Sequence, residues 1–157
     1  MAKLYGVGVG PGDPELITVK AVNIIKKCSV IAFPDMNTAY KIAKAACPEI
    51  EAKELAALKF LMTGNKEEES KAHQAAAFSL EKYLDEDKDI AFLTLGDPCI
   101  YSTFMYIEKI VAAHGYETEI ISGVPSFCAA GAAFKISLAE GNTQLHIVTG
   151  GGNIAEA

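Results

Sequence analysis

The chain has 157 residues, of which 50% are hydrophobic, and its formal net charge is −6 because 20 acidic residues outnumber 14 lysines, with no arginine. This balance argues against nucleic acid as a partner, because there is no basic patch or arginine fork. No run of about 18 apolar residues predicts a membrane span, and the start Met-Ala-Lys-Leu-Tyr lacks the apolar region of a signal peptide. The cysteines lack a Cys-x-x-Cys pair, which favours reduced thiols in the cytoplasm over disulfides or a metal site: Cys28, Cys47, Cys99 and Cys128.

The N-terminal segment predicts a strand, a glycine-rich first loop and a helix. Lys3 to Val9 is typical of a short strand, and the first loop follows at Gly10 to Thr18. Asp13 is a good N-cap and Pro14 suits the first helical position, after which apolar residues recur at helical spacing. The glycines do not match a dinucleotide fingerprint or a phosphate-binding loop, because the third glycine and the Lys-Ser or Lys-Thr pair are missing. A purely structural turn is the alternative.

Strand and helix signals then alternate along residues 29–85. Ser29 to Phe33 predicts a strand, and Thr38 to Cys47 predicts a helix that ends before Pro48. Glu51 to Leu58 fits either a strand or a helix, as short apolar runs often do. Lys66 to Asp85 predicts a long, acidic and largely solvated helix.

A second loop, Thr94 to Thr103, reads Thr-Leu-Gly-Asp-Pro-Cys-Ile-Tyr-Ser-Thr. It lies between a buried strand at Asp89 to Leu93 and a helix at Phe104 to His114, where open α/β sheets place their ligands. Its glycine allows close approach of a ligand, and its carboxylate and hydroxyls suit a polar small molecule. The alternative is that Asp97 only caps the helix.

A third loop, Ser122 to Phe127, follows a predicted strand at Gly115 to Ile121. The small residues Cys128 to Ala133 predict a helix that packs closely against another backbone or a flat ligand, or that is simply a tightly packed core helix. A further strand is expected at Gln144 to Thr149, then a loop, and Ile154 to Ala157 resembles the first turn of another helix.

This alternation predicts an α/β fold. We expect an N-terminal domain at residues 1–113, with a mainly parallel sheet flanked by helices, and the start of a second α/β domain at residues 116–157.

Together the three loops resemble the tetrapyrrole (corrin/porphyrin) methyltransferases. The resemblance rests on Val7 to Thr18, on Gly96-Asp97-Pro98 followed by Tyr101-Ser102-Thr103, and on Gly123 to Phe127. It runs from Lys3 to about Ile154. Members of this family exceed 200 residues, so the chain is interpreted as truncated at its C-terminus.

The resemblance implies S-adenosylmethionine as the cofactor, bound between two α/β domains. The positions that match the family's cofactor contacts are Pro11, Leu95, Gly96, Asp97, Ile100, Ser102, Thr103, Pro125 and Ser126. The positions implied to face the tetrapyrrole are Gly10, Gly12, Asp13 and Tyr101. No catalytic residue is identified.

The implied reaction is methyl transfer to carbon 20 of precorrin-2 or cobalt-precorrin-2 in cobalamin biosynthesis. Two alternatives stay open: transfer at another position or to another tetrapyrrole, and a truncated binding module without catalysis. The carboxylate-rich substrate needs positive charge, for which Lys3, Lys20 and Lys135 are candidates, although a solvated surface position is the ordinary alternative for each. We expect a cytoplasmic homodimer, and this truncated chain is expected to be weakly active or inactive.

Overall fold

The computed structural model describes residues 2–34, 38–60 and 64–148. Within these ranges the strands form one sheet in the order β3-β2-β4-β1-β5, and each pairing is parallel. The strands are β1 (Lys3–Gly8), β2 (Val30–Pro34), β3 (Glu54–Leu58), β4 (Ile90–Thr94) and β5 (Glu117–Ile121). The predicted α/β class with a mainly parallel sheet is confirmed.

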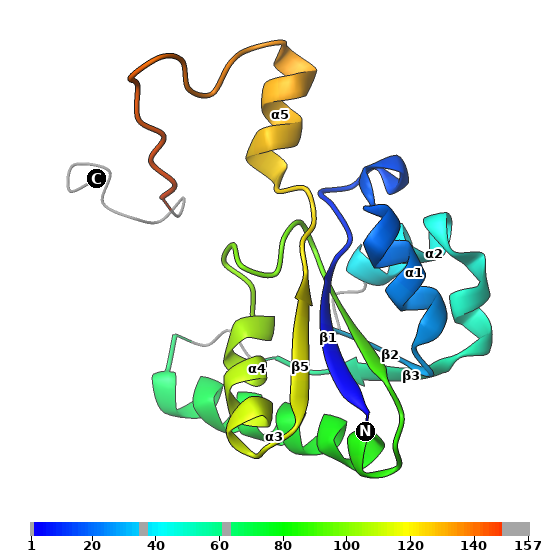
Figure 1. The fold of residues 1–157 in the computed structure, drawn as a ribbon. Helices are drawn as coiled ribbons and strands as arrows, with labels where there is room; N and C mark the ends of the chain where they lie inside the picture. The colour runs from blue at the N-terminus through cyan, green and yellow to red at the C-terminus, as the bar shows by residue number, and fades with distance from the viewer. Residues whose placement is uncertain (1, 35–37, 61–63, 149–157) are drawn as a thin grey trace. The chain divides into compact units, whose positions relative to one another are not determined.

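Helices connect the strands and begin at recognisable signals (Figure 1). Thr18 Oγ1 accepts a hydrogen bond from the backbone N–H of Ala21 at 3.2 Å, and Asn65 Oδ1 accepts one from Glu67 at 3.0 Å. The α-helices are α1 (Val19–Lys27), α2 (Thr38–Ala46), α3 (Lys66–Asp85), α4 (Phe104–Ala113) and α5 (Ser126–Phe134). The 3-10 helices are η1 (Pro14–Leu16) and η2 (Pro48–Ala52).

Two local predictions need refinement. Asp13 does cap a helix, because its Oδ1 accepts from Glu15 N at 2.9 Å, but that helix is the short η1. The longer helix α1 starts separately after Thr18. The ambiguous segment that begins at Glu51 divides between the two candidate structures, with η2 first and β3 after it.

Helices cover both faces of the sheet, with α1 and α2 on one face and α3 and α4 on the other (Figure 1). Successive strand residues therefore enter two different cores. Tyr5 of β1 packs in the same core as Ile25 of α1, whereas Leu4 shares a core with Leu80 of α3 and Phe104 of α4. Burial on both faces explains why β4 is a continuous apolar run rather than an alternating one.

The chain divides into two compact units, Met1–Ser126 and Phe127–Ala157. The sequence predicts a boundary between residues 113 and 116 instead. The structure differs because β5 belongs to the first sheet, where Lys3 aligns with Glu117 and Val7 with Ile121. Strand β5 therefore completes the first unit, and the first unit extends to Ser126.

The second unit departs from the sequence prediction in two respects. In α5 only Gly131 is buried, so the interpretation as a core helix is wrong for the described residues. A Cβ on Gly131 would lie 3.2 Å from Leu138 Cγ, so the small residue lets the following segment approach the helix. The strand expected at 144–149 is absent from described residues 144–148, which pair with no neighbouring strand. The expected loop at 150–153 and the helical turn from Ile154 lie outside the described residues.

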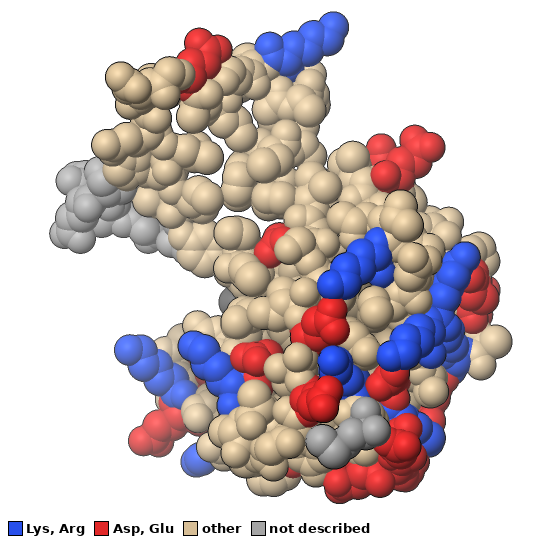
Figure 2. All heavy atoms as spheres, viewed as in Figure 1, with Lys and Arg blue, Asp and Glu red and all other residues tan. Residues whose placement is uncertain are grey.

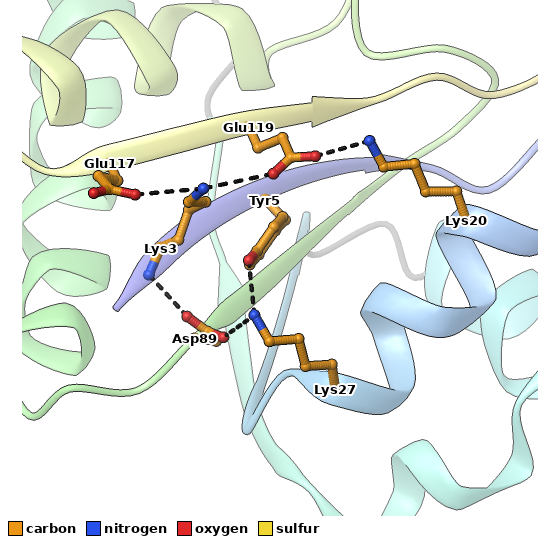
Figure 3. Close-up of polar contacts among 7 residues, drawn as sticks. All are labelled: Lys3, Tyr5, Lys20, Lys27, Asp89, Glu117 and Glu119. Atoms are coloured by element: carbon orange, nitrogen blue, oxygen red, sulfur yellow. Dashed lines mark hydrogen bonds and ion pairs between the residues drawn. The ribbon is translucent and has the colours of Figure 1, made fainter. Parts of the chain in front are cut away.

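A network of ion pairs ties β1, β5 and α1 together (Figure 3). Lys3 Nζ lies 3.3 Å from a Glu117 carboxylate oxygen, and Lys20 Nζ lies 2.8 Å from Glu119. Lys3 and Lys20 were candidates for contacting a carboxylate-rich substrate, but these lysines are paired with carboxylates of the chain itself. Their positive charge is therefore used to hold the edge strand β5 in place.

Asp89 is the most embedded acid of this network. Its Oδ1 accepts from the backbone N–H of Lys3 at 2.9 Å, and its Oδ2 lies 2.8 Å from Lys27 Nζ, which also donates to Tyr5 OH at 2.9 Å (Figure 3). Burial alone would raise the pKa of Asp89, but the Lys27 ion pair and the Lys3 N–H outweigh it and lower this pKa below its ordinary value.

Replacing Asp89 by asparagine should lower the melting temperature at pH 7, because the amide cannot pair with Lys27. A carboxyl whose pKa is lowered by folding stabilises the protein above its unfolded pKa of about 3.9, and this contribution disappears as the pH falls through the folded value. The difference between Asp89→Asn and wild type in thermal denaturation should therefore shrink between roughly pH 5 and pH 2. Glu117→Gln, at a more exposed pair, is the control and should melt close to wild type. A difference that is absent at pH 7, or constant across this range, would contradict the assignment.

Candidate functional site

The three loops emerge side by side at one edge of the sheet. They follow β1, β4 and β5, which are adjacent in the order β4-β1-β5 and all parallel, so their carboxyl ends share an edge. The connection after β1 passes over the α1 face, whereas the connection after β4 passes over the α4 face. The two loops therefore diverge between β1 and β4, which is where open α/β sheets bind ligands.

Glycines bring the backbones of the three loops into contact. A Cβ on Gly8 would lie 2.6 Å from Gly96 O and 2.7 Å from Gly123 Cα, and a Cβ on Gly123 would lie 2.1 Å from Gly96 O. No side chain fits at either position. Gly96 N donates to Gly10 O at 2.8 Å and Gly10 N donates back to Gly96 O at 3.3 Å, which fastens the first loop to the second. Gly10 and Gly96 have φ angles of +78° and +68°, which favour glycine.

Asp97 joins the second loop to the third. Its Oδ1 accepts from Cys99 N at 2.8 Å and its Oδ2 accepts from Gly123 N at 2.9 Å. Asp97 does not cap α4, because that helix begins at Phe104, whose N–H donates to Ser102 Oγ at 3.2 Å. Both oxygens of the carboxylate thus fix loop geometry.

A cavity of about 110 Å³ lies where the three loops meet, and we call it the loop cavity. Its lining is Pro11, Leu95, Gly96, Asp97, Ile100, Pro125 and Ser126. These are the residues that the family resemblance implies for the cofactor, apart from Ser102 and Thr103. Ligand pockets typically have roughly 300–1,000 Å³, so the loop cavity has room for part of a cofactor.

The remaining predicted residues lie around the loop cavity without lining it. Ser102 Oγ is 2.9 Å from Thr94 Oγ1 at the end of β4. Tyr101 has a φ of +47°, a left-handed conformation that strains a bulky residue, and its side chain is 67% exposed. Gly12 and Asp13 lie beyond Pro11 in the first loop, and Asp13 caps η1. The role of these residues stays a prediction.

The cysteine of the second loop is not an activated nucleophile. Burial and the nearby Asp97 carboxylate raise the pKa of the Cys99 thiol above its ordinary value. The thiol therefore stays protonated at neutral pH, and only the thiolate is a strong nucleophile.

A second cavity, of about 570 Å³, lies between α3 and α4, and we call it the helix cavity. It is lined by Phe60, Lys66, Glu69, Ser70, His73, Thr103, Tyr106 and Ile110. His73 belongs to the helix that the sequence predicts to be largely solvated, and Tyr106 belongs to no motif of the sequence. The contact between His73 and Tyr106 depends on how α3 packs on α4, which no local sequence pattern predicts. Thr103, predicted for the cofactor, lines this cavity instead.

Within the ranges that the structure describes, no helix is long and apolar enough to cross a membrane, and no group of His, Cys, Asp and Glu side chains could hold a metal ion. On the face shown in Figure 2, acidic and basic residues are interspersed rather than gathered by sign.

The chain matches the family described as tetrapyrrole (corrin/porphyrin) methylases over residues 3–157. It is 40% identical over 154 residues to a Methanocaldococcus jannaschii protein named probable cobalt-precorrin-2 C(20)-methyltransferase. The match covers 95% of this chain and 64% of that protein, so the chain spans less than two thirds of the relative's length.

Solved structures of similar proteins share the fold. The structure of a cobalt precorrin-4 methyltransferase has a TM-score of 0.67 at 28% identity and covers 92% of this chain and 55% of its own. A uroporphyrin-III C-methyl transferase from Thermus thermophilus, complexed with S-adenyl homocysteine, has a TM-score of 0.67 at 23% identity, with 90% and 55% covered.

Replacing Gly123 by alanine should lower the free energy of unfolding by about 3 kcal/mol or more, because the new Cβ would strike the backbone of Gly96, which cannot rotate aside. Gly115→Ala is the control. A Cβ there meets nothing within 4 Å, and only the φ of +93° opposes it, at about 1–2 kcal/mol. Urea denaturation measures both variants. Equal losses would show that the three loops are not in backbone contact.

Proposed function

We propose, for a chain that belongs to the tetrapyrrole (corrin/porphyrin) methylase family, that it takes part in S-adenosylmethionine-dependent methyl transfer to carbon 20 of cobalt-precorrin-2 or precorrin-2 in cobalamin biosynthesis. The observation that carries the proposal is the loop cavity, whose lining coincides with the positions that the family resemblance implies for the cofactor. The choice of carbon 20 is supported by the name of the 40% identical relative.

The loop cavity suits a ligand with both apolar and polar parts. Pro11, Leu95, Ile100 and Pro125 offer apolar contact, while Asp97 and Ser126 offer polar atoms. Gly8, Gly96 and Gly123 let the backbones of the three loops touch beside the loop cavity, so the fold itself shapes the cavity. When bound, S-adenosylmethionine supplies an electrophilic methyl group on a sulfonium. The chain's residues hold and orient the donor.

Orientation is the main catalytic contribution expected of this site. The sulfur leaves as a neutral thioether, so the transfer needs no strong acid, and alignment of the two reactants can lower the barrier by roughly 7–11 kcal/mol. The loop cavity provides the rigidity for this alignment, because hydrogen bonds at Gly10, Gly96 and Asp97 hold its three loops together. We assign no residue to the removal of the proton from the methylated carbon.

Tyr101 and the glycine-rich first loop remain our candidates for contact with the tetrapyrrole. Tyr101 is the more specific of them, because surrounding hydrogen bonds at Cys99 and Ser102 hold its backbone in a strained conformation that presents an exposed ring. We also propose a homodimer in the cytoplasm. The dimer is supported by exposed apolar side chains of the second unit, such as Phe134 and Ile136.

Another ring position is the alternative that the comparisons favour. A cobalt precorrin-4 methyltransferase has the same fold at 28% identity, so the fold serves more than one acceptor. A binding module without catalysis is the other alternative. Because the chain spans 64% of its relative's length, cofactor binding and turnover need separate tests.

Asp97→Ala should weaken the binding of S-adenosylhomocysteine by about tenfold or more, whereas Cys99→Ala should leave it close to wild type. The alanine at 97 removes the acceptor that holds the Cys99 and Gly123 N–H groups, and hydrogen bonds to charged groups contribute about 1.5–3 kcal/mol each. Isothermal titration calorimetry measures both affinities. Asp97→Asn keeps one acceptor oxygen, so its affinity for S-adenosylhomocysteine should lie between those of Asp97→Ala and Cys99→Ala. Equal affinity of the alanine variants would count against this cofactor site.

Incubation of the chain with S-adenosylmethionine and cobalt-precorrin-2 or precorrin-2 should give a product heavier by one methyl group, with a rate well below that of a full-length relative. Mass spectrometry detects the product, and the fragmentation pattern locates the new methyl group. A methyl group at another carbon would support the alternative acceptor position. Cofactor binding without any product would support the binding module.

A further inference from the structure

The helix cavity is the larger of the two cavities described above, and the methyl donor proposal leaves it without a role. Its volume of about 570 Å³ falls within the range of small-molecule sites, and its lining combines aromatic rings with a few polar groups. The geometry points to the helix cavity as the place where a flat pyrrole-derived ring of the methyl acceptor binds, with the Tyr106–His73 pair as its stacking wall. This inference rests on the proposed function.

The wall is a parallel pair of rings anchored in the core. The His73 and Tyr106 ring centroids are 4.9 Å apart and their planes differ by 3°. The ring centroid of Phe60 lies 6.1 Å from that of His73 and 6.4 Å from that of Phe92. The Phe92 side chain is fully buried in the core beside the sheet. Tyr106 is nevertheless 60% exposed. An exposed aromatic ring that already stacks on a neighbour is suited to stacking against another planar ring.

The polar residues of the helix cavity suit an acceptor with carboxylate side chains. Among the described residues, no ion pair involves Lys66, in contrast to Lys3, Lys20 and Lys27. Glu69 also lines the cavity, and its Oε1 accepts from Gly64 N at 3.0 Å. Ser70 and Thr103 add hydroxyls that can donate to an acceptor carboxylate. Lys66 therefore offers the acceptor a cation that no carboxylate of the described residues holds in an ion pair, with Glu67, Glu68 and Glu69 beside it on the first turn of α3.

The second loop connects the two cavities. Leu95, Gly96, Asp97 and Ile100 line the loop cavity, and Thr103 lines the helix cavity. The bond between Ser102 Oγ and Thr94 Oγ1 fixes the loop where it passes from one to the other. The two cavities therefore share one loop, so that a ring in the helix cavity would contact the loop that also lines the donor site.

A second aromatic pair between the same helices provides an internal comparison. Phe78 of α3 and His114, which follows α4, have ring centroids 5.8 Å apart. His114 Nδ1 lies 2.7 Å from Glu81 Oε1, so a polar contact within the fold accounts for this pair. Phe78 is 57% exposed, much as Tyr106 is, but it does not line the helix cavity.

The test is an anaerobic absorbance titration of the chain with cobalt-precorrin-2 and with precorrin-2, beside a calorimetric titration with S-adenosylhomocysteine. Tyr106→Ala should weaken tetrapyrrole binding by about tenfold or more, as loss of a stacking contact does, and leave S-adenosylhomocysteine affinity unchanged. Tyr106→Phe keeps the ring and should bind like wild type. Phe78→Ala, the matched control, should leave both affinities unchanged. Lys66→Met should weaken binding most at low salt.

A second variant avoids any loss of packing. Ser70→Trp adds a ring to an exposed position on the rim and should block the helix cavity, so it should weaken tetrapyrrole binding while melting like wild type. Wild-type affinity in both Tyr106→Ala and Ser70→Trp would overturn the inference, as would failure of the wild-type chain to bind either tetrapyrrole. Binding that depends on Tyr106 without methyl transfer would support the cavity assignment and contradict the proposed activity. Methyl transfer at the wild-type rate in both Tyr106→Ala and Ser70→Trp would support the proposed activity and contradict the cavity assignment.

Discussion

The candidate site depends on one steric constraint, the mutual contact of backbones at Gly8, Gly96 and Gly123. Because β4, β1 and β5 are adjacent and parallel, their loops emerge a strand spacing apart, and only residues without Cβ atoms let them close on one another. Once they touch, short hydrogen bonds become available between Gly10 and Gly96 and between Asp97 and Gly123. The loop cavity is what remains beside this contact. Its shape is therefore set by backbone, which explains why its polar side chain Asp97 holds loops together rather than standing free.

The lysines of the chain fall into those that pair with carboxylates beside the sheet and those, such as Lys66, that have no ion pair with the described residues. At the edge where the strands begin, lysines and carboxylates neutralise one another around Asp89, and the network fixes β5 against β1 and α1. An acidic chain that offers a site to a carboxylate-rich molecule has to keep some cations out of such pairs. Lys66, on the first turn of α3, is outside any ion pair with the described residues and lines a cavity at the opposite edge, where the loops emerge. A net charge of −6 is thus compatible with a lysine that lines a cavity without an ion pair to the described residues.

The sequence was a good guide wherever the determining interaction is local or carried by a motif. The bounds of α3 follow from periodicity, and the parallel sheet follows from the alternation of strand and helix signals. The residues that line the loop cavity are among those implied by the family resemblance that three motifs carry. Prediction failed where distant segments decide. The unit boundary falls after Ser126 rather than near residue 113, because β5 returns to pair with β1. The double role of Asp97 needs Gly123 as a partner across the sheet edge, and the His73–Tyr106 stack needs α3 to lie on α4. Neither contact can be predicted from the spacing of residues within one segment.

The two cavities differ in what determines them, and this difference has a consequence for specificity. The loop cavity is formed chiefly by backbone geometry around glycines and prolines, so most substitutions there disturb the fold of the site itself. The helix cavity is formed by side chains on the surfaces of two regular helices, and residues such as Tyr106 and Ser70 are exposed enough to change without loss of core packing. On the proposed assignment of donor and acceptor, such a fold can retain one donor while its acceptor changes, because the two cavities have different lining residues and share the second loop. The occurrence of the same fold in a cobalt precorrin-4 methyltransferase at 28% identity accords with that division.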